Sequence, residues 1–129
     1  MEKTHQIFVL LDNKPGTSFE LCRILKKKNI SIFALAMFVD SARLHVSNPE
    51  ATMKALQEHG YNCEIREVLR EVLPNKQGAM MLLTQKLSNA GININYLYGT
   101  IEEKQKHGTL ILEVDQPDLA MNIFKNHKY

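Results

Sequence analysis

The residue types that most often carry chemistry in proteins form no cluster in this sequence. Cys22 and Cys63 have no second cysteine or histidine at the spacing of zinc ligands, and the five histidines are scattered. No Ser/His/Asp or Cys/His constellation and no glycine-rich phosphate loop is recognisable. We therefore predict that the protein is not an enzyme and uses neither a metal ion nor a cofactor.

Two turns do combine residue types that suit a small polar ligand. Asn13 and Gly16 lie in the turn DNKPG, and Asn75 and Gly78 lie in the turn PNKQG. Each turn precedes a predicted helix, whose first N–H groups and dipole favour an anion such as a carboxylate. Glycine permits close approach to the backbone, and asparagine offers a donor and an acceptor to a zwitterion. The alternative is a purely structural role, because these residue types also dominate turns.

The two turns correspond because the chain contains an internal repeat. At an offset of 62 positions the asparagines and glycines of the turns align, together with leucines and isoleucines of the predicted core. Farther along the chain the offset becomes 68, as in the pair Tyr61 and Tyr129. The polar residues 102–108 (EEKQKHG) explain the extra length as a longer hairpin loop. The repeat predicts two tandem modules, residues 1–66 and 67–129.

Both modules are expected to have the same order of elements. In the first, Thr17 and Glu20 are spaced as a capping box, and Asn48 followed by Pro49 is typical of a helix start. The expected elements of this module are strand 5–11, helix 17–29, strands 32–39 and 42–47, helix 49–60 and strand 61–65. This β-α-β-β-α-β order predicts an α+β protein with two tandem ferredoxin-like modules.

The second module is expected to lack its last strand. Tyr129 aligns with Tyr61, which opens the last strand of the first module. The backbone of residues 67–73 would then have unpaired donors and acceptors. Our hypothesis is that another chain or a swapped strand pairs with it. The other elements of this module are predicted at strand 67–73, a helix ending at Ala90, strands 94–101 and 108–114, and a helix from Pro117.

The run at residues 32–39 (IFALAMFV) is apolar at nearly every position. A strand with one solvated face would instead alternate between apolar and polar residues. We therefore expect both faces to be buried, against the other module or a second chain. This predicts tight pairing of modules in a homo-oligomer, most simply a homodimer.

A βαββαβ module with these turns, and with residues 29–32 (NISI) entering its second strand, resembles the ACT domain family. The second module repeats the pattern with residues 91–94 (GINI). The resemblance covers nearly the whole chain and is to small free-standing proteins of two tandem ACT domains. It implies a non-catalytic regulatory protein that binds a small ligand, an amino acid, at the interface of paired modules. The effect of binding would pass to a target enzyme of amino-acid metabolism.

The resemblance also implies where the ligand is held, namely the turn before the first helix and the start of the second strand. The corresponding residues are Asn13, Gly16 and Ser31 in the first module and Asn75, Gly78 and Asn93 in the second. Each copy departs from the family pattern, because Ser31 replaces an asparagine and Gln77 replaces the proline before glycine. We expect binding to be asymmetric and slightly favour the second module, which keeps both asparagines.

Other classes of function are disfavoured. A net charge of +2 is too small to attract a nucleic acid by its electrostatic field. No apolar stretch approaches the ~20 residues that span a membrane. A cytoplasmic protein is the simplest expectation. Acylphosphatase chemistry would need an arginine between the first strand and first helix, and neither copy has one. The main alternative is a ligand-free oligomerisation or protein-interaction module with the same fold and empty loops.

Overall fold

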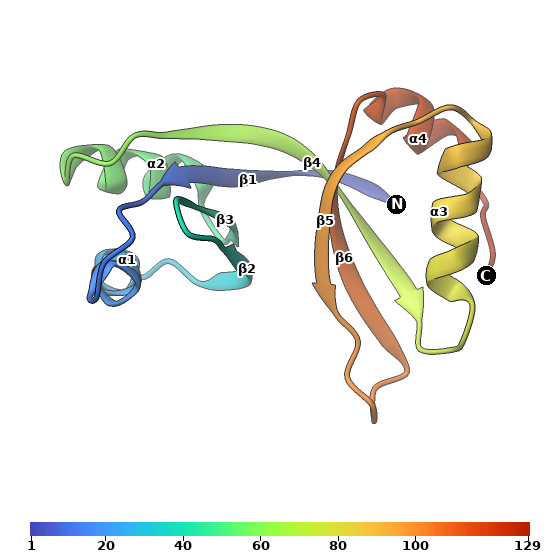
Figure 1. The fold of residues 1–129 in the computed structure, drawn as a ribbon, viewed down its shortest axis with the longest axis horizontal. Helices are drawn as coiled ribbons and strands as arrows, with labels where there is room; N and C mark the ends of the chain where they lie inside the picture. Colours follow the sequence, from blue (N-terminus) through green and yellow to red (C-terminus); the bar gives the residue numbers. More distant parts are fainter. The chain divides into compact units, whose positions relative to one another are not determined.

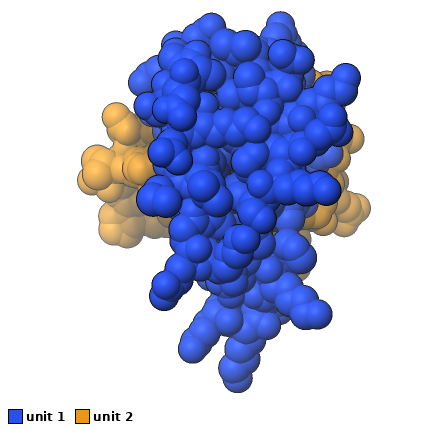
Figure 2. Space-filling model, turned by 90° about the vertical axis from the view of Figure 1, so that its right-hand side faces the viewer, with its two compact units in different colours: residues 1–4, 67–129 blue, residues 5–66 orange.

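The computed structural model describes residues 1–129 and divides them into two compact units (Figure 2). Unit 2 comprises His5–Arg66 and corresponds to the first repeat. Unit 1 comprises Met1–Thr4 and Glu67–Tyr129 and corresponds to the second repeat together with the first four residues. Both units are mixed α+β with antiparallel strands, which confirms the predicted fold class. No helix is long and apolar enough to cross a membrane.

Unit 2 is built on four strands in the order β2-β3-β1-β4. Its elements are β1 (Glu2–Leu10), α1 (Thr17–Lys27), β2 (Ile32–Met37), β3 (Ser41–Val46), α2 (Pro49–Glu58) and the first part of β4 (Cys63–Pro74) (Figure 1). Ile7 of β1 and Leu35 of β2 both pair with Leu44 of the central strand β3. The buried residues of β1 and β3 form one core with those of α1 and α2, so both helices cover one face of the strands.

Unit 1 repeats this plan with the order β1-β4-β6-β5. Its further elements are α3 (Ala79–Asn89), β5 (Ile94–Thr100), β6 (His107–Val114) and α4 (Pro117–Ile123) (Figure 1). Leu112 of β6 pairs with Leu69 of β4 and with Leu97 of β5. Both helices lie on the same side of these strands (Figure 1), and their buried residues share one core with β4 and β6.

The start of the chain completes unit 1, whose last element is α4. The expected separate strands at 61–65 and 67–73 are one continuous strand, β4, and β1 begins early enough to lie beside its second part. Lys3 Nζ pairs with Glu67 Oε1 at 3.5 Å and also with Asp118, and Met1 packs against the core of this unit. The last strand that the second repeat lacks is therefore supplied by residues 2–4, and the expected gap beside β4 is filled within the chain.

Backbone conformation determines where α1 and α3 start, whereas a side chain caps α2. Gly16 (φ 92°) and Gly78 (φ 88°) are the N-caps of α1 and α3, in the left-handed region that favours glycine. The capping box predicted at Thr17 is wrong, because Thr17 already lies inside the helix and no side chain caps it. The prediction for α2 is confirmed, because Asn48 Oδ1 accepts a hydrogen bond from the N–H of Ala51 at 3.1 Å.

Strand β2 is less buried than its apolar sequence predicts. It is the outermost strand of unit 2 and has one neighbour, β3. Phe33, Leu35 and Val39 are 66%, 43% and 70% exposed. The expectation that both faces of residues 32–39 are buried is therefore wrong within the chain, because Phe33 and Leu35 lie two positions apart on the strand face that neither helix covers. An apolar edge of this kind is normally covered by another surface.

Candidate functional site

The turn between β1 and α1 is open to solvent in unit 2. Asn13 and Gly16 are both exposed, and a Cβ added to Gly16 would meet no heavy atom within 4 Å. Glycine is therefore required here by the positive φ rather than by crowding. Gly78 in unit 1 has the same conformation and the same free space. Both predicted glycines leave their backbone accessible to a ligand.

Ser31 lies at the opposite end of unit 2 from this turn. Ser18 Oγ donates to Met37 Sδ at 2.9 Å, so the start of α1 lies at the end of β2, whereas Ser31 comes just before β2 begins. The 11 residues of α1, at about 1.5 Å each, separate the two ends by roughly 16 Å. The structure therefore does not bring Gly16 and Ser31 together within one unit. The equally long α3 separates Gly78 and Asn93 in the same way.

The start of the second strand is held by the same contact in both units. The N–H of Ser31 donates to Ser47 Oγ at 2.9 Å, and the N–H of Ser47 donates to the carbonyl of Ser31 at 3.0 Å. In unit 1 the N–H of Asn93 donates to Asp115 Oδ1 at 2.9 Å, and the N–H of Asp115 returns a bond to the carbonyl of Asn93 at 3.2 Å. Both positions are thus pre-organised at the surface, where Ser31 and Asn93 are exposed.

Asn75 has a structural task that the sequence did not reveal. Its Nδ2 lies 3.0, 3.3 and 2.8 Å from the carbonyl oxygens of Glu102, Glu103 and Gln105. These residues belong to the longer hairpin loop of the second repeat. The Asn75 amide is therefore occupied in holding this loop, which favours the structural interpretation of this asparagine over a role in ligand binding.

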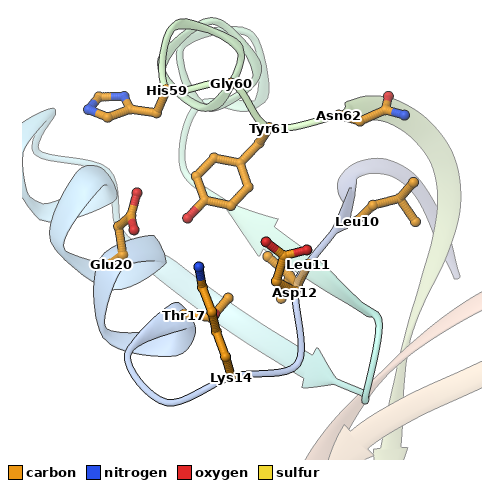
Figure 3. Close-up of a pocket in the computed structure, with 10 residues that line it drawn as sticks. All are labelled: Leu10, Leu11, Asp12, Lys14, Thr17, Glu20, His59, Gly60, Tyr61 and Asn62. Carbon is orange, nitrogen blue, oxygen red and sulfur yellow. The ribbon is translucent and has the colours of Figure 1, made fainter.

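A hollow of ≈ 380 Å³ lies within unit 2, beside the predicted turn (Figure 3). One wall comes from the end of β1 and the start of α1, and the other from the connection between α2 and β4. Its lining residues are Leu10, Leu11, Asp12, Lys14, Thr17, Glu20, His59, Gly60, Tyr61 and Asn62. None of them was among the predicted site residues. The two walls are at least 39 residues apart in sequence, so local patterns could not have joined them.

The hollow is lined by both acidic and basic side chains. Asp12 and Glu20 carry carboxylates, and Lys14 carries an ammonium group. Burial raises the pKa of the Tyr61 phenol, and the carboxylate of Glu20 raises this pKa further by its charge and by hydrogen bonding. Tyr61 therefore stays a neutral hydrogen-bond donor over the physiological pH range.

No group of three or more His, Cys, Asp and Glu side chains in the structure is arranged to hold a metal ion. Cys22 is exposed, and burial raises the pKa of the Cys63 thiol, which lowers its nucleophilicity.

The comparisons with known proteins relate nearly the whole chain to one family. A family model described as "ACT domain pair" matches residues 2–129. No curated protein matches the sequence. Among solved structures, protein BT0572 from Bacteroides thetaiotaomicron is 28% identical with a TM-score of 0.87, over 95% of this chain and 87% of that chain.

Aspartate kinases provide more distant likenesses. The ligand-free regulatory subunit from Thermus thermophilus is 14% identical with a TM-score of 0.68, over 95% of both chains. E. coli aspartokinase III in complex with lysine and aspartate is 16% identical with a TM-score of 0.62, over 97% of this chain and 31% of that chain. At these identities the likeness shows a shared fold.

Proposed function

This chain belongs to the ACT domain family, as a pair of ACT domains, and on that premise we propose that it is a non-catalytic regulatory protein. It binds a small ligand, an amino acid, between paired modules. The effect of binding passes to a target enzyme of amino-acid metabolism in the cytoplasm. The relatives of similar fold include regulatory subunits of aspartate kinase, which supports this class of role.

The observation that carries the proposal is the separation of the two predicted contacts within each unit. A ligand that touches both the turn at Gly16 and the strand start at Ser31 has to bridge two modules, because roughly 16 Å separate these residues in one module. Antiparallel pairing of two β2 edges would place the turn of one copy beside the strand start of the other. The interface would then supply both halves of a site.

The exposed side chains of β2 support such pairing. Phe33 and Leu35 lie on an edge strand and retain 66% and 43% of their exposure in the single chain. Covering them removes apolar surface from water, which is the main driving force of association. A homodimer built on this edge is therefore part of the proposal.

A ligand-free assembly module is the second candidate function. The bonds of Asn75 Nδ2 to the hairpin loop favour it, because they leave one of the two predicted turn asparagines without a free donor for a ligand. This alternative uses the same edge and the same dimer but no amino acid.

A thermal-shift screen with the twenty amino acids separates the two candidates. A ligand that binds the native state at a concentration of 100 times its Kd stabilises it by about 2.7 kcal/mol and raises Tm. Asn93→Ala or Ser31→Ala should abolish the shift at the corresponding site, whereas Asn122→Ala, an equally exposed asparagine on α4, should leave it unchanged. Flat curves at millimolar ligand would support the assembly module instead.

A further inference from the structure

The hollow of unit 2 is complete within one module. The N–H of Leu10 donates to the carbonyl of Asn62 at 3.0 Å, and the N–H of Tyr61 donates to the carbonyl of Leu56 at 3.0 Å. The first bond joins the two walls, and the second fixes the backbone of Tyr61 against the end of α2. A volume of ≈ 380 Å³ lies in the range of small-molecule sites, about 300–1,000 Å³. This cavity therefore needs no second module to be formed, unlike the interface site proposed above.

Its polar side chains converge on one space. Lys14, Glu20 and Tyr61 point toward one another across the hollow, and Asp12 lies at its edge (Figure 3). Because Thr17, Glu20 and Tyr61 are half-buried, water competes only in part for hydrogen bonds to their polar groups inside the hollow. A pocket with a few convergent polar groups beside apolar residues, here Leu10 and Leu11, has the construction of a ligand site.

The charges of the hollow define the complementary ligand. Two carboxylates, Asp12 and Glu20, face one ammonium, Lys14, so the lining carries a net charge of about −1. A ligand of complementary charge has two ammonium groups and one carboxylate. Charge-assisted hydrogen bonds to both kinds of group are the strong ones in proteins. A simple anion would be repelled by the two carboxylates, and a diamine would be repelled by Lys14.

The fold itself does not require these carboxylates. At the repeat offset of 62, Asp12 corresponds to Pro74 and Glu20 to Leu82, whereas Lys14 corresponds to Lys76. The second repeat thus makes the same strand, turn and helix without either acidic residue. The acidic pair is a property of the hollow in unit 2.

We propose that this hollow is a second binding site, distinct from the interface between modules, and that it takes an amino acid with a cationic side chain. One ammonium group of the ligand pairs with Glu20, and unit 1 supplies no residue to this site. The other ammonium pairs with Asp12, and the ligand carboxylate pairs with Lys14. Tyr61 donates a hydrogen bond to the bound molecule or to Glu20.

Isothermal titration of the full chain with ornithine tests the proposal, with alanine and putrescine as probes that lack one part of the pattern. Ornithine should bind at least tenfold more tightly than either. Glu20→Gln should weaken ornithine binding at least tenfold, whereas Glu58→Gln, an exposed glutamate at the end of α2 outside the hollow, should leave it unchanged. Lys14→Gln should remove the preference for ornithine over putrescine.

The outcomes also distinguish this site from the interface site. Ornithine binding that survives Ser31→Ala and Asn93→Ala but not Glu20→Gln supports the hollow. Binding that is lost in Ser31→Ala and kept in Glu20→Gln would assign ornithine to the interface and overturn the proposal. No heat with ornithine at millimolar concentration, for protein with an unchanged circular dichroism spectrum, would overturn it as well.

Discussion

Tyr61 in unit 2 and Tyr129 in unit 1 occupy equivalent positions of the repeat, and the two units use them differently. Tyr61 lines an open hollow. Tyr129 donates its hydroxyl to Glu71 Oε2 at 2.7 Å, and Glu71 Oε1 lies 3.0 Å from the ammonium group of Met1. Burial and the bond to Glu71 raise the pKa of Tyr129. The same residue thus faces an open hollow in one copy and packs in the interior of the other.

The preceding histidines show the same contrast. His59 of unit 2 is exposed and lies with Nδ1 2.8 Å from the carbonyl of Ala55. His127 of unit 1 packs edge-on against Tyr129, with ring centroids 4.5 Å apart, and accepts a hydrogen bond from Lys86 Nζ at 2.9 Å. The two repeats therefore share a fold, but equivalent residues have different surroundings. A ligand site in one unit does not imply an equivalent site in the other.

The largest expected effect comes from breaking the buried contact of unit 1. Glu71→Gln leaves the Met1 ammonium without its counter-charge, and loss of one partner of a buried ion pair costs about 3–5 kcal/mol. Urea unfolding followed by circular dichroism measures the change. Glu103→Gln, on the exposed hairpin loop, is the matched control. A loss below 1 kcal/mol would mean that this contact does not close unit 1.

The two turn glycines should respond alike, which tests where the units remain equivalent. Gly16→Ala and Gly78→Ala each place a Cβ at a φ near 90°, which costs about 1–2 kcal/mol although the space is free. Unfolding free energies of the two variants measured under one condition should agree within experimental error. A much larger loss at one glycine would reveal a contact at that turn beyond the backbone conformation.

The two turn asparagines should respond differently. Asn75→Ala removes the bonds to the hairpin loop, so amide exchange at residues 102–106 should accelerate and stability should fall by about 1 kcal/mol. Asn13 is exposed on a shorter loop, and Asn13→Ala should change neither quantity. Equal responses of both variants would contradict the structural task assigned to Asn75.

The smallest effect is a pH dependence confined to unit 1. Burial, followed by the charge of Lys86, lowers the pKa of His127 below its ordinary value of 6.5. The unfolded chain therefore takes up this proton first as the pH falls below 6.5, and the native state loses stability down to the lowered pKa. Melting curves between pH 7.5 and 5 should show this loss, and His127→Gln should reduce it. An unchanged pH profile in the variant would exclude His127 as its source.

Much of the fold was predictable from local patterns. Apolar runs between turn residues marked the strands, and Asn48 with Pro49 marked the start of α2 correctly. The capping box at Thr17 failed because the positive φ of Gly16 begins the helix, and φ is a property of the backbone that the side-chain spacing does not report. The exposure of Phe33 and Leu35 was missed because composition does not tell which face of a strand the helices cover.

The candidate site was predictable only in part. The turn at Asn13 and Gly16 was recognised from residue types, but Tyr61 and Asn62 joined it through the neighbouring strands β1 and β4. Such pairing links residues about 50 positions apart, and no local propensity encodes it. The occupied amide of Asn75 likewise depends on a loop about 30 residues away.

The sequence by itself determined the repeat, the order of the elements and the turns before the helices, because these depend on the periodicity and chemistry of neighbouring residues. Tertiary structure alone decided that residues 2–4 complete unit 1, that Asn75 holds a loop, and that Asp12, Lys14, Glu20 and Tyr61 share a hollow. The physical reason is that strand pairing and burial join distant segments, and the free energy of those contacts is absent from any short stretch of chain.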